Sequence, residues 1–273
     1  MTDELRTYGI KERAACSGPL DEHAQEIQLV GYTVVKDVVA QDELRQWRDR
    51  IDSVLERQLS EGGGSEAMRA LGEAHTARAL LAYDEAFLDL ALRPVVLGIC
   101  ERLLGDYFVL NQQNAVVNPP AGSAHHQSAY HRDLPYQHFV ASRPLAISAL
   151  YCIDPFEVDT GGTLVLAGSH KLEAFPGAAV VERLERTPEA PAGACLVFDS
   201  MLYHRAGTNL TDRPRRAVNH VWSLPILKQQ IVLKDLLRPG LRNDLRLRKL
   251  LGVESDPPRS VAEWIAQRRG RSA

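Results

Sequence analysis

The chain has 273 residues, of which 45% are hydrophobic and 25% are charged, and its formal net charge is −3. This composition is typical of a globular protein with a sizeable core, and we expect a single domain over residues 1–273. The body of the chain carries no basic stripe and no run of about 18 apolar residues, so we expect no nucleic-acid partner and no membrane insertion.

The four cysteines are too far apart in the sequence for a CxxC metal or redox motif. Three of them, Cys100, Cys152 and Cys195, lie in apolar segments, which predicts buried and reduced thiols. The N-terminus has no signal-peptide pattern. These features favour a cytoplasmic location, and the sequence leaves the oligomeric state open.

The first 105 residues combine one short strand with helices. The β-branched segment 31–39 predicts a strand, and apolar residues at helical spacing predict a helix over 40–59. Three consecutive glycines then predict a mobile loop over 60–68. Segment 85–105 predicts one or two buried helices, with Pro94 in the first turn of the second. We therefore expect a helical support over residues 40–105.

From residue 106 the sequence changes to short segments rich in β-branched and aromatic residues, separated by Gly, Pro, Asn and Asp. At least six such segments predict a sandwich or barrel core over about residues 106–225. Residues 230–270 return to a helical pattern, in which Ser260 is a candidate N-cap and Glu263 completes a capping box. The expected fold is mainly β with flanking helices.

The stretch AYHRDLPYQ (129–137) contains His131 and Asp133 two residues apart. On a strand, residues i and i+2 point to the same face, so both side chains could reach one ion while Arg132 points away. Such a pair also arises by chance, and a third ligand is needed. His204 follows an apolar strand and could complete the set of two histidines and one carboxylate that non-haem Fe(II) oxygenases use.

Arg215 lies eleven residues after His204, at the start of a strand that could run beside it. An oxygenase that uses 2-oxoglutarate needs a buried cation for the distal carboxylate of that molecule, and a guanidinium can meet it with two parallel hydrogen bonds. The alternative is that Arg213, Arg215 and Arg216 form a basic turn. If the segment is a strand, Arg216 points to the opposite face from Arg215.

Three motifs together, YHRD (130–133), GGTLVLAGSHK (161–171) and HRAGTNLTDRPRR (204–216), resemble the phytanoyl-CoA dioxygenase family. The resemblance covers roughly residues 28 to 225. It implies a double-stranded β-helix (jelly roll, cupin-like), with Fe(II) as cofactor and 2-oxoglutarate and O2 as cosubstrates. It also implies that His131, Asp133 and His204 are the catalytic metal ligands and that Arg215 holds the 2-oxoglutarate carboxylate.

The sequence departs from the family pattern at four positions. Members often have Trp, Gln, Pro and a hydroxyl residue where this chain has Tyr130, Arg132, Ala167 and Ala206. The missing hydroxyl leaves the second anchor of the carboxylate open, and we expect Thr208 or Gln113 to supply it. Related iron halogenases carry a small residue at the carboxylate position, so Asp133 implies oxygen insertion or desaturation.

Other polar residues near the motifs have weaker assignments. We expect Tyr136 and His138 to line the substrate pocket, because binding sites are concave and rich in aromatic side chains. His125 and His126 are expected in a solvated loop, with substrate contact as the alternative. His170 is expected to hold a turn, and His220 to lie on the opposite strand face from Arg215. The loops at 60–68 and 119–130 are candidate lids.

The expected function is an Fe(II)- and 2-oxoglutarate-dependent dioxygenase that oxidises a small-molecule metabolite, with natural-product biosynthesis as one setting. The sequence has no clear basic patch for the phosphates of a CoA thioester. Two alternatives stay open: an iron enzyme of the same fold that does not use 2-oxoglutarate, and a jelly-roll binding module without catalysis.

Overall fold

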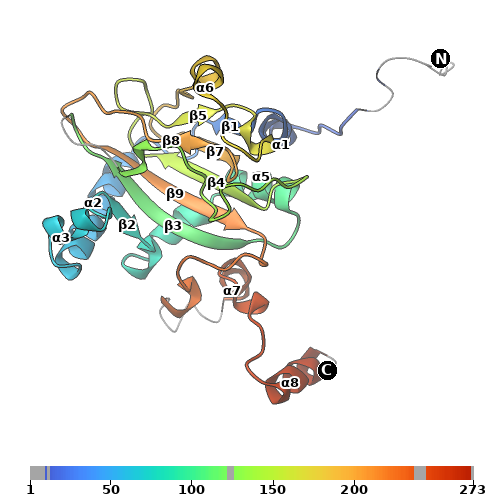
Figure 1. Ribbon diagram of the computed structural model, residues 1–273. Helices are drawn as coiled ribbons and strands as arrows, with labels where there is room; N and C mark the ends of the chain where they lie inside the picture. Colours follow the sequence, from blue (N-terminus) through green and yellow to red (C-terminus); the bar gives the residue numbers. More distant parts are fainter. Residues whose placement is uncertain (1–9, 11–12, 122–125, 237–243, 272–273) are drawn as a thin grey trace.

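The computed structural model describes residues 10, 13–121, 126–236 and 244–271 (Figure 1). Two antiparallel sheets make the centre of the molecule. The large sheet has the order β1-β7-β4-β9-β3-β2, and the small sheet has the order β6-β5-β8. Except for β2 with β3 and β5 with β6, neighbours in these orders are not consecutive in the sequence, as expected for a double-stranded β-helix. The predicted mainly β core is confirmed.

The strands of the large sheet are β1 (Tyr32–Val35), β2 (Thr76–Arg78), β3 (Val109–Asn118), β4 (Ala146–Cys152), β7 (Cys195–Asp199) and β9 (Arg215–Ser223). Those of the small sheet are β5 (Leu164–Leu166), β6 (Glu185–Arg186) and β8 (His204–Arg205). The central strands β4 and β7 are buried along their whole length, because one face of the large sheet meets helices and the other meets the small sheet.

The alternation of side chains in β9 separates the two faces of the large sheet. Val218 and Trp222 belong to the main core cluster, which also contains residues of the helices. Ala217 belongs instead to a second cluster with Val165 of the small sheet. The face that carries residues 215, 217 and 219 is therefore directed toward the small sheet.

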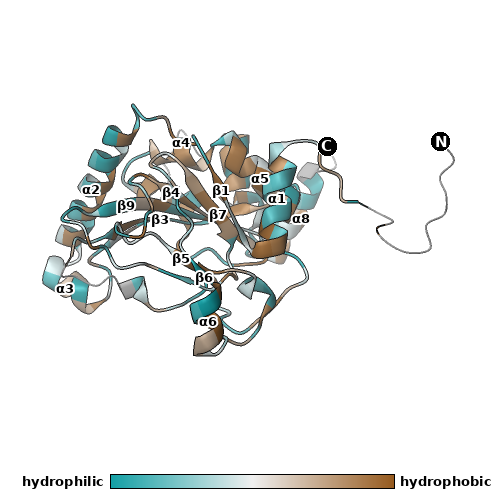
Figure 2. Cartoon of the chain, turned by 90° about the horizontal axis from the view of Figure 1, so that it is seen from above, coloured by the Kyte–Doolittle hydropathy of each residue, from teal (hydrophilic) through white to brown (hydrophobic). Residues whose placement is uncertain are grey.

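The helices that precede β3 are α1 (Pro19–Val30), α2 (Leu44–Glu61), α3 (Ser65–Ala70), α4 (Phe87–Ala91) and α5 (Pro94–Leu104), with a 3-10 turn η1 (Leu80–Ala82). Seen from above, α2, α4 and α5 lie along one side of the large sheet, and β5, β6 and α6 (Ala178–Leu184) lie on the other (Figure 2). Trp47, Ile51, Phe87 and Ile99 bury the helix layer against the sheet. The predicted position of Pro94 in the first turn of a helix is confirmed.

The predicted loop over 60–68 is wrong except for its three glycines. Helix α2 continues to Glu61 and α3 begins at Ser65, so only a short turn separates the two helices. Gly63 and Gly64 have φ values of 89° and 95°, a region that L side chains rarely adopt. The glycines are therefore used to reverse the chain tightly. Helix α1, which the sequence analysis did not predict, lies against α5 and β1.

After β9 the chain forms η4 (Leu233–Leu236), α7 (Leu245–Leu250), η6 (Val253–Ser255) and α8 (Val261–Arg271). The Ser260 hydroxyl accepts a hydrogen bond from the Glu263 N–H at 3.1 Å, which confirms the predicted cap. Helix α8 lies apart from the sheets (Figure 1). None of the described helices is long and apolar enough to cross a membrane.

Candidate metal centre

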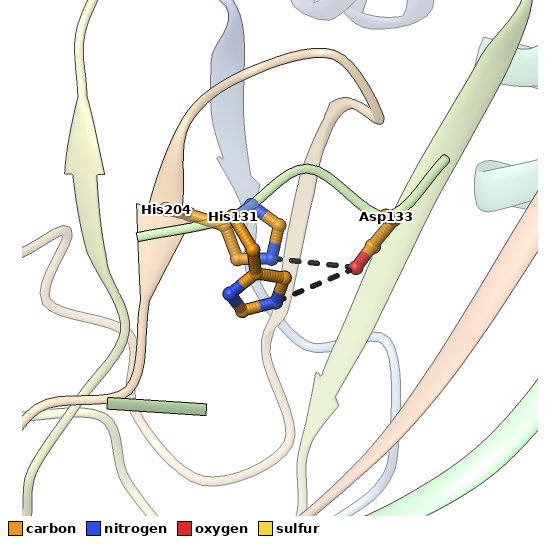
Figure 3. A group of neighbouring side chains, drawn as sticks. All are labelled: His131, Asp133 and His204. Atoms are coloured by element: carbon orange, nitrogen blue, oxygen red, sulfur yellow. Dashed lines mark ion pairs between the residues drawn. The ribbon is translucent and has the colours of Figure 1, made fainter. Parts of the chain in front are cut away.

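His131 and His204 lie side by side because their backbones pair. The N–H of His131 donates to the carbonyl of His204 at 2.9 Å, and the reverse bond is 3.1 Å. This antiparallel bridge extends the small sheet beyond β8 and places both imidazoles on one face, with ring centroids 4.4 Å apart. Both rings face the Asp133 carboxylate (Figure 3).

One oxygen of Asp133 is directed toward both histidines. Asp133 Oδ1 lies 3.4 Å from His204 Nε2 and 3.9 Å from His131 Nε2. The other oxygen, Oδ2, accepts hydrogen bonds from Ser148 Oγ at 2.6 Å and from Asn219 Nδ2 at 3.3 Å. One ligand atom from each of the three residues lies within 4.8 Å of the others. The carboxylate is therefore held from β4 and β9, and Oδ1 stays directed at the imidazoles.

The second nitrogen of each imidazole is occupied by the backbone. His131 Nδ1 lies 3.0 Å from the carbonyl of Ala129, and His204 Nδ1 lies 3.0 Å from the carbonyl of Leu202. A carbonyl only accepts, so each Nδ1 carries the proton. This leaves Nε2 as the metal-facing atom, an arrangement that is common for histidine ligands.

The three groups are strongly coupled electrostatically. Burial alone would raise the pKa of Asp133, but the charges of His204 and His131 and hydrogen bonds from His204 and Ser148 hold that pKa below its usual value. Burial would likewise lower the pKa of His204, and the Asp133 carboxylate overcomes this and raises it. A divalent cation can replace the proton that the triad otherwise shares.

Arg132 points away from this centre, as predicted. Its guanidinium lies 3.9 Å from the centre of the Tyr203 ring. It donates to the carbonyls of Phe139 at 3.2 Å and Ser169 at 3.1 Å, and also to those of Gln137 and Leu172. Arg132 thus joins the HxD segment to the loop that follows it and to η3 (Ser169–Lys171).

Arg215 lies on the face of β9 that is directed toward the small sheet. It is 97% buried, at a relative exposure of 3%, and its guanidinium lies 4.3 Å from the centre of the Phe156 ring. One amino group donates to the Gly161 carbonyl at 3.0 Å, but Nε has no hydrogen-bond partner in the described part of the chain. Burial lowers its pKa to about 10, so the group stays charged at neutral pH. A buried cation with an unused donor suits a carboxylate ligand.

The neighbouring arginines have other partners, as the alternation of faces predicts. Arg216 forms ion pairs with Asp52 at 2.7 Å and with Asp154 at 3.2 Å. Arg213 is exposed. Of these three residues, only Arg215 is buried on the face of the large sheet that is directed toward the small sheet and the candidate metal ligands.

The expected second anchor Gln113 is on the wrong side of the sheet. Its amide nitrogen donates to the Phe87 carbonyl at 2.9 Å, and its oxygen accepts from the Leu81 N–H at 2.8 Å. We therefore correct this assignment, since the amide of Gln113 serves the helix layer. Thr208 is exposed, and its expected role stays a prediction. Asn118, directly opposite Arg215 in the sheet, shares the Gly161 carbonyl as an acceptor at 3.1 Å.

The remaining histidines are placed as follows. His138 is exposed, with Nδ1 3.4 Å from the Glu173 carbonyl, and Tyr136 lies nearby on the same exposed loop; their contact with a substrate stays a prediction. His125 lies outside the described residues, so its expected place in a solvated loop stays a prediction. His126 begins the 3-10 turn η2 (His126–Ser128). His170 is buried in η3, and His220 is buried on the helix-covered face beside Gln113.

Sequence reasoning missed Ser148 and Asn219, which hold Asp133, and Asn118. Each lies on the strand face that is directed toward the small sheet, so a register for β3, β4 and β9 would have been needed to find them. The segments themselves carry only the alternation of small, polar and apolar residues, which does not tell which face is which.

Comparisons with known proteins agree with this geometry. The sequence profile of the phytanoyl-CoA dioxygenase (PhyH) family matches residues 27–217. The uncharacterized protein Rv1501 of Mycobacterium tuberculosis is 36% identical over 253 residues, which cover 90% of this chain and 91% of that protein.

Solved structures have the same fold. EctD from S. alaskensis, determined with 2-oxoglutarate and 5-hydroxyectoine, is 20% identical with a TM-score of 0.61, over 75% of this chain and 76% of that chain. The epimerase SnoN, in complex with Fe3+, alpha ketoglutarate and nogalamycin RO, is 20% identical with a TM-score of 0.56, over 81% of this chain and 90% of that chain. These similarities establish the double-stranded β-helix fold.

Proposed function

The chain belongs to the phytanoyl-CoA dioxygenase family, and we propose that it is an Fe(II)- and 2-oxoglutarate-dependent dioxygenase that oxidises a small-molecule metabolite. Hydroxylation or a related C–H oxidation is the proposed reaction, and natural-product biosynthesis is one setting for it. The observation that carries the proposal is the convergence of His131, Asp133 and His204 on one point, on the same side of the sheet as the buried Arg215.

The residues present fit both groups. Two imidazole Nε2 atoms and one carboxylate oxygen would hold Fe(II) and leave other coordination positions open. The unused Nε of Arg215 supports a carboxylate ligand at the start of β9. Between Arg215 and Asn219 the site-facing position is Ala217, a small residue that is buried in the cluster with Val165.

Bound iron and 2-oxoglutarate would supply the O2-dependent cleavage of a substrate C–H bond. The chain's own part is to position these groups. Ser148 and Asn219 fix the rotation of the Asp133 carboxylate, and the Ala129 and Leu202 carbonyls fix the two imidazoles. Arg215 would orient the cosubstrate by its far end. The carboxylate of Asp133 occupies the position that a halide would need, which favours oxygenation over halogenation.

The two alternatives fit the site less well. An iron enzyme without 2-oxoglutarate would have no use for Arg215, whose burial without an acidic partner among the described residues costs solvation energy. A binding module without catalysis would not need three ligand atoms aimed at one point with their outer atoms already hydrogen-bonded.

The direct test is 2-oxoglutarate turnover by the iron-loaded protein in the presence of O2. We expect succinate and CO2 to form in equal amounts, and their formation to cease when His131 or His204 is replaced by Ala. The opposite result is a protein that binds Fe(II) but consumes no 2-oxoglutarate with any of a broad set of candidate metabolites. It would favour the alternative of an iron enzyme that does not use this cosubstrate.

A further inference from the structure

The contact with Asp133 fixes the orientation of the Asn219 side-chain amide. Its Nδ2 donates to Asp133 Oδ2 at 3.3 Å. A rotation of the amide by 180° would place two acceptor oxygens against each other, so Oδ1 must point the other way. This oxygen is buried and has no hydrogen-bond partner within the described ranges of the chain. It therefore presents an unused acceptor immediately beside a candidate metal ligand.

The partner of Asn219 Oδ1 must be a hydrogen-bond donor. A 2-oxoglutarate molecule has one keto group and two carboxylates, and all of these only accept. The cosubstrate cannot satisfy this atom. A hydroxyl group on the substrate can, and it would then lie next to the carbon that is held near the metal.

Two more polar side chains, one amide and one guanidinium, continue from Asn219 across the large sheet. Asn114 of β3 lies directly opposite Asn219, and Arg78 of β2 lies directly opposite Asn114. Directly paired residues share a face, and neighbouring strands are about 4.8 Å apart. The row from Asn219 to Arg78 is therefore about 10 Å long, which is the size of a small molecule.

The polar groups in this row are loosely bonded to one another. Asn114 fits its surroundings best with its amide nitrogen toward the Gln113 carbonyl at 3.0 Å and its oxygen 3.2 Å from an amino group of Arg78. The side chain of Arg78 lies 3.4 Å from that of Gln230, so the contacts between side chains in the row are 3.2 Å or longer. These distances are long for amide hydrogen bonds. Amides that carry both donors and acceptors and are not tightly paired can bond to hydroxyl groups, which also donate and accept.

The row ends at a cavity with an apolar lining and balanced charges. This cavity of about 620 Å³ is bounded by Arg78 together with Met68, Ala79, Tyr83, Ile231 and Leu236. Arg78 pairs with Glu73 at 2.7 Å, and Arg57, also at the wall, pairs with Glu61 at 2.9 Å. An anionic ligand would have to break one of these pairs, so the cavity suits an uncharged carbon skeleton.

We propose that Asn219 and Asn114 recognise a hydroxyl group of an uncharged, largely apolar substrate, whose body extends along β3 and β2 into the cavity beyond Arg78. This deepens the proposed function and rests on it. Asn219 would join substrate recognition to the metal centre, since the same amide holds Asp133 and accepts from the substrate hydroxyl. A free acid or a CoA thioester is not the expected substrate.

The test compares three probes with one bicyclic skeleton: 2-decalol, its methyl ether and decalin-2-carboxylate. Each is titrated anaerobically into the Fe(II) and 2-oxoglutarate form, and binding is measured by ligand-observed NMR. One hydrogen bond is worth about 1 kcal/mol, so we expect the alcohol to bind about fivefold more tightly than the ether, and the carboxylate to bind most weakly.

The variants Asn219→Leu and Asn114→Leu should remove this preference, because leucine has nearly the shape of asparagine without its polar atoms. Gln46→Leu is the matched control, since Gln46 is an exposed amide on the helix α2; it should keep the preference. Iron content is measured in each variant, and Asn114→Leu, which does not touch Asp133, should keep it in full.

Equal binding of alcohol and ether, tighter binding of the carboxylate, absence of alcohol binding, or an unchanged preference in both Leu variants would each overturn the inference. The charge-transfer absorption of Fe(II) with 2-oxoglutarate, recorded in the same samples without probe, separates the two claims. If the band is absent from the wild type, the proposed function fails; if it is present and the alcohol preference is absent, only this inference fails.

Discussion

His131 and His204 exchange backbone hydrogen bonds at 2.9 and 3.1 Å, so the two imidazoles of the candidate metal centre are fixed by sheet pairing. The HxD segment and β8 are far apart in the sequence, and this one bridge sets their register. A shift of this pairing by one residue would put the two imidazoles on opposite faces, one of them on the outer face where Arg132 and Tyr203 now stack.

Replacing either histidine should abolish iron binding. His131→Ala and His204→Ala each remove one of three ligands, and the remaining pair cannot hold Fe(II) in the facial arrangement. We expect iron measured by atomic absorption to fall from about one per chain to less than about a tenth. The exposed His138 is the matched control, and His138→Ala should retain its iron. Full iron content in both site variants would show that the metal binds elsewhere.

Ser148→Ala tests whether the hydrogen bond to Asp133 Oδ2 at 2.6 Å positions the carboxylate. Loss of such a partner typically lowers metal affinity about 10- to 100-fold, and we expect the dissociation constant of Fe(II), or of Co(II) as a substitute, to rise by this factor. Ser142→Ala, at an exposed site, should leave it unchanged. If Ser148→Ala and the wild type bind the metal with equal affinity, the hydrogen bond from Asn219 alone is enough to position the Asp133 carboxylate.

Arg132→Ala should destabilise the fold. The buried guanidinium donates to four carbonyls, two of them in the loop after the HxD motif and two around η3. Hydrogen bonds from charged groups contribute about 1.5–3 kcal/mol each, and their carbonyls would stay behind without a partner. We expect a loss of about 3 kcal/mol or more in urea unfolding, against less than about 0.5 kcal/mol for the exposed Arg143→Ala. Similar losses in both variants would contradict this role.

Asp199 should make stability depend on pH. Burial raises its pKa from 3.8 to about 6, although the Met201 N–H and the charges of Lys171 and Arg132 oppose this. The folded state therefore holds a proton that the unfolded state has lost between about pH 4 and pH 6, and stability falls as the pH rises through this window. The free energy of unfolding should fall by roughly 2–3 kcal/mol across this window.

Asp199→Asn removes this dependence and keeps an acceptor for the Met201 N–H, which now lies 2.9 Å from Asp199 Oδ1. Relative to the wild type, the metal-free variant should therefore gain roughly 2 kcal/mol between about pH 4 and pH 7. Urea unfolding of the wild type and of Asp199→Asn, each at about pH 4 and at about pH 7, measures this gain in the free energy of unfolding. A difference between the proteins that does not change with pH would exclude the effect of Asp199.

The sequence allowed the candidate ligands to be predicted but not the residues around them. The period of two in a strand relates His131 to Asp133, and the resemblance of the motifs to the family pattern adds His204 and Arg215; both signals are local properties of the sequence. Ser148 and Asn219 reach Asp133 from strands whose neighbours are distant in sequence. Only the pairing of β4 with β9 brings them there, and no local pattern encodes that pairing.

The two errors have physical reasons. Gln113 and Asn114 are adjacent, so one faces the helices and the other the small sheet, and a register bulge between Leu110 and Gln112 obscures which is which. The glycine run at 62–64 predicts the centre of a loop. In fact glycines also permit a tight reversal between two helices, and the polar sequence of α3 gave no apolar stripe to indicate a helix.

The measurement that tests the account most directly is anaerobic titration of the Fe(II) form with 2-oxoglutarate, followed by its charge-transfer absorption, in the wild type and in Arg215→Ala and Arg216→Ala. A carboxylate buried without its partner costs about 3–5 kcal/mol, so Arg215→Ala should weaken 2-oxoglutarate binding by at least about 100-fold at 1.4 kcal/mol per tenfold, with iron retained. Arg216→Ala, which loses only its pairs with Asp52 and Asp154 on the opposite face, should bind 2-oxoglutarate as the wild type does. Unchanged binding in Arg215→Ala, or loss in Arg216→Ala alone, would contradict the account.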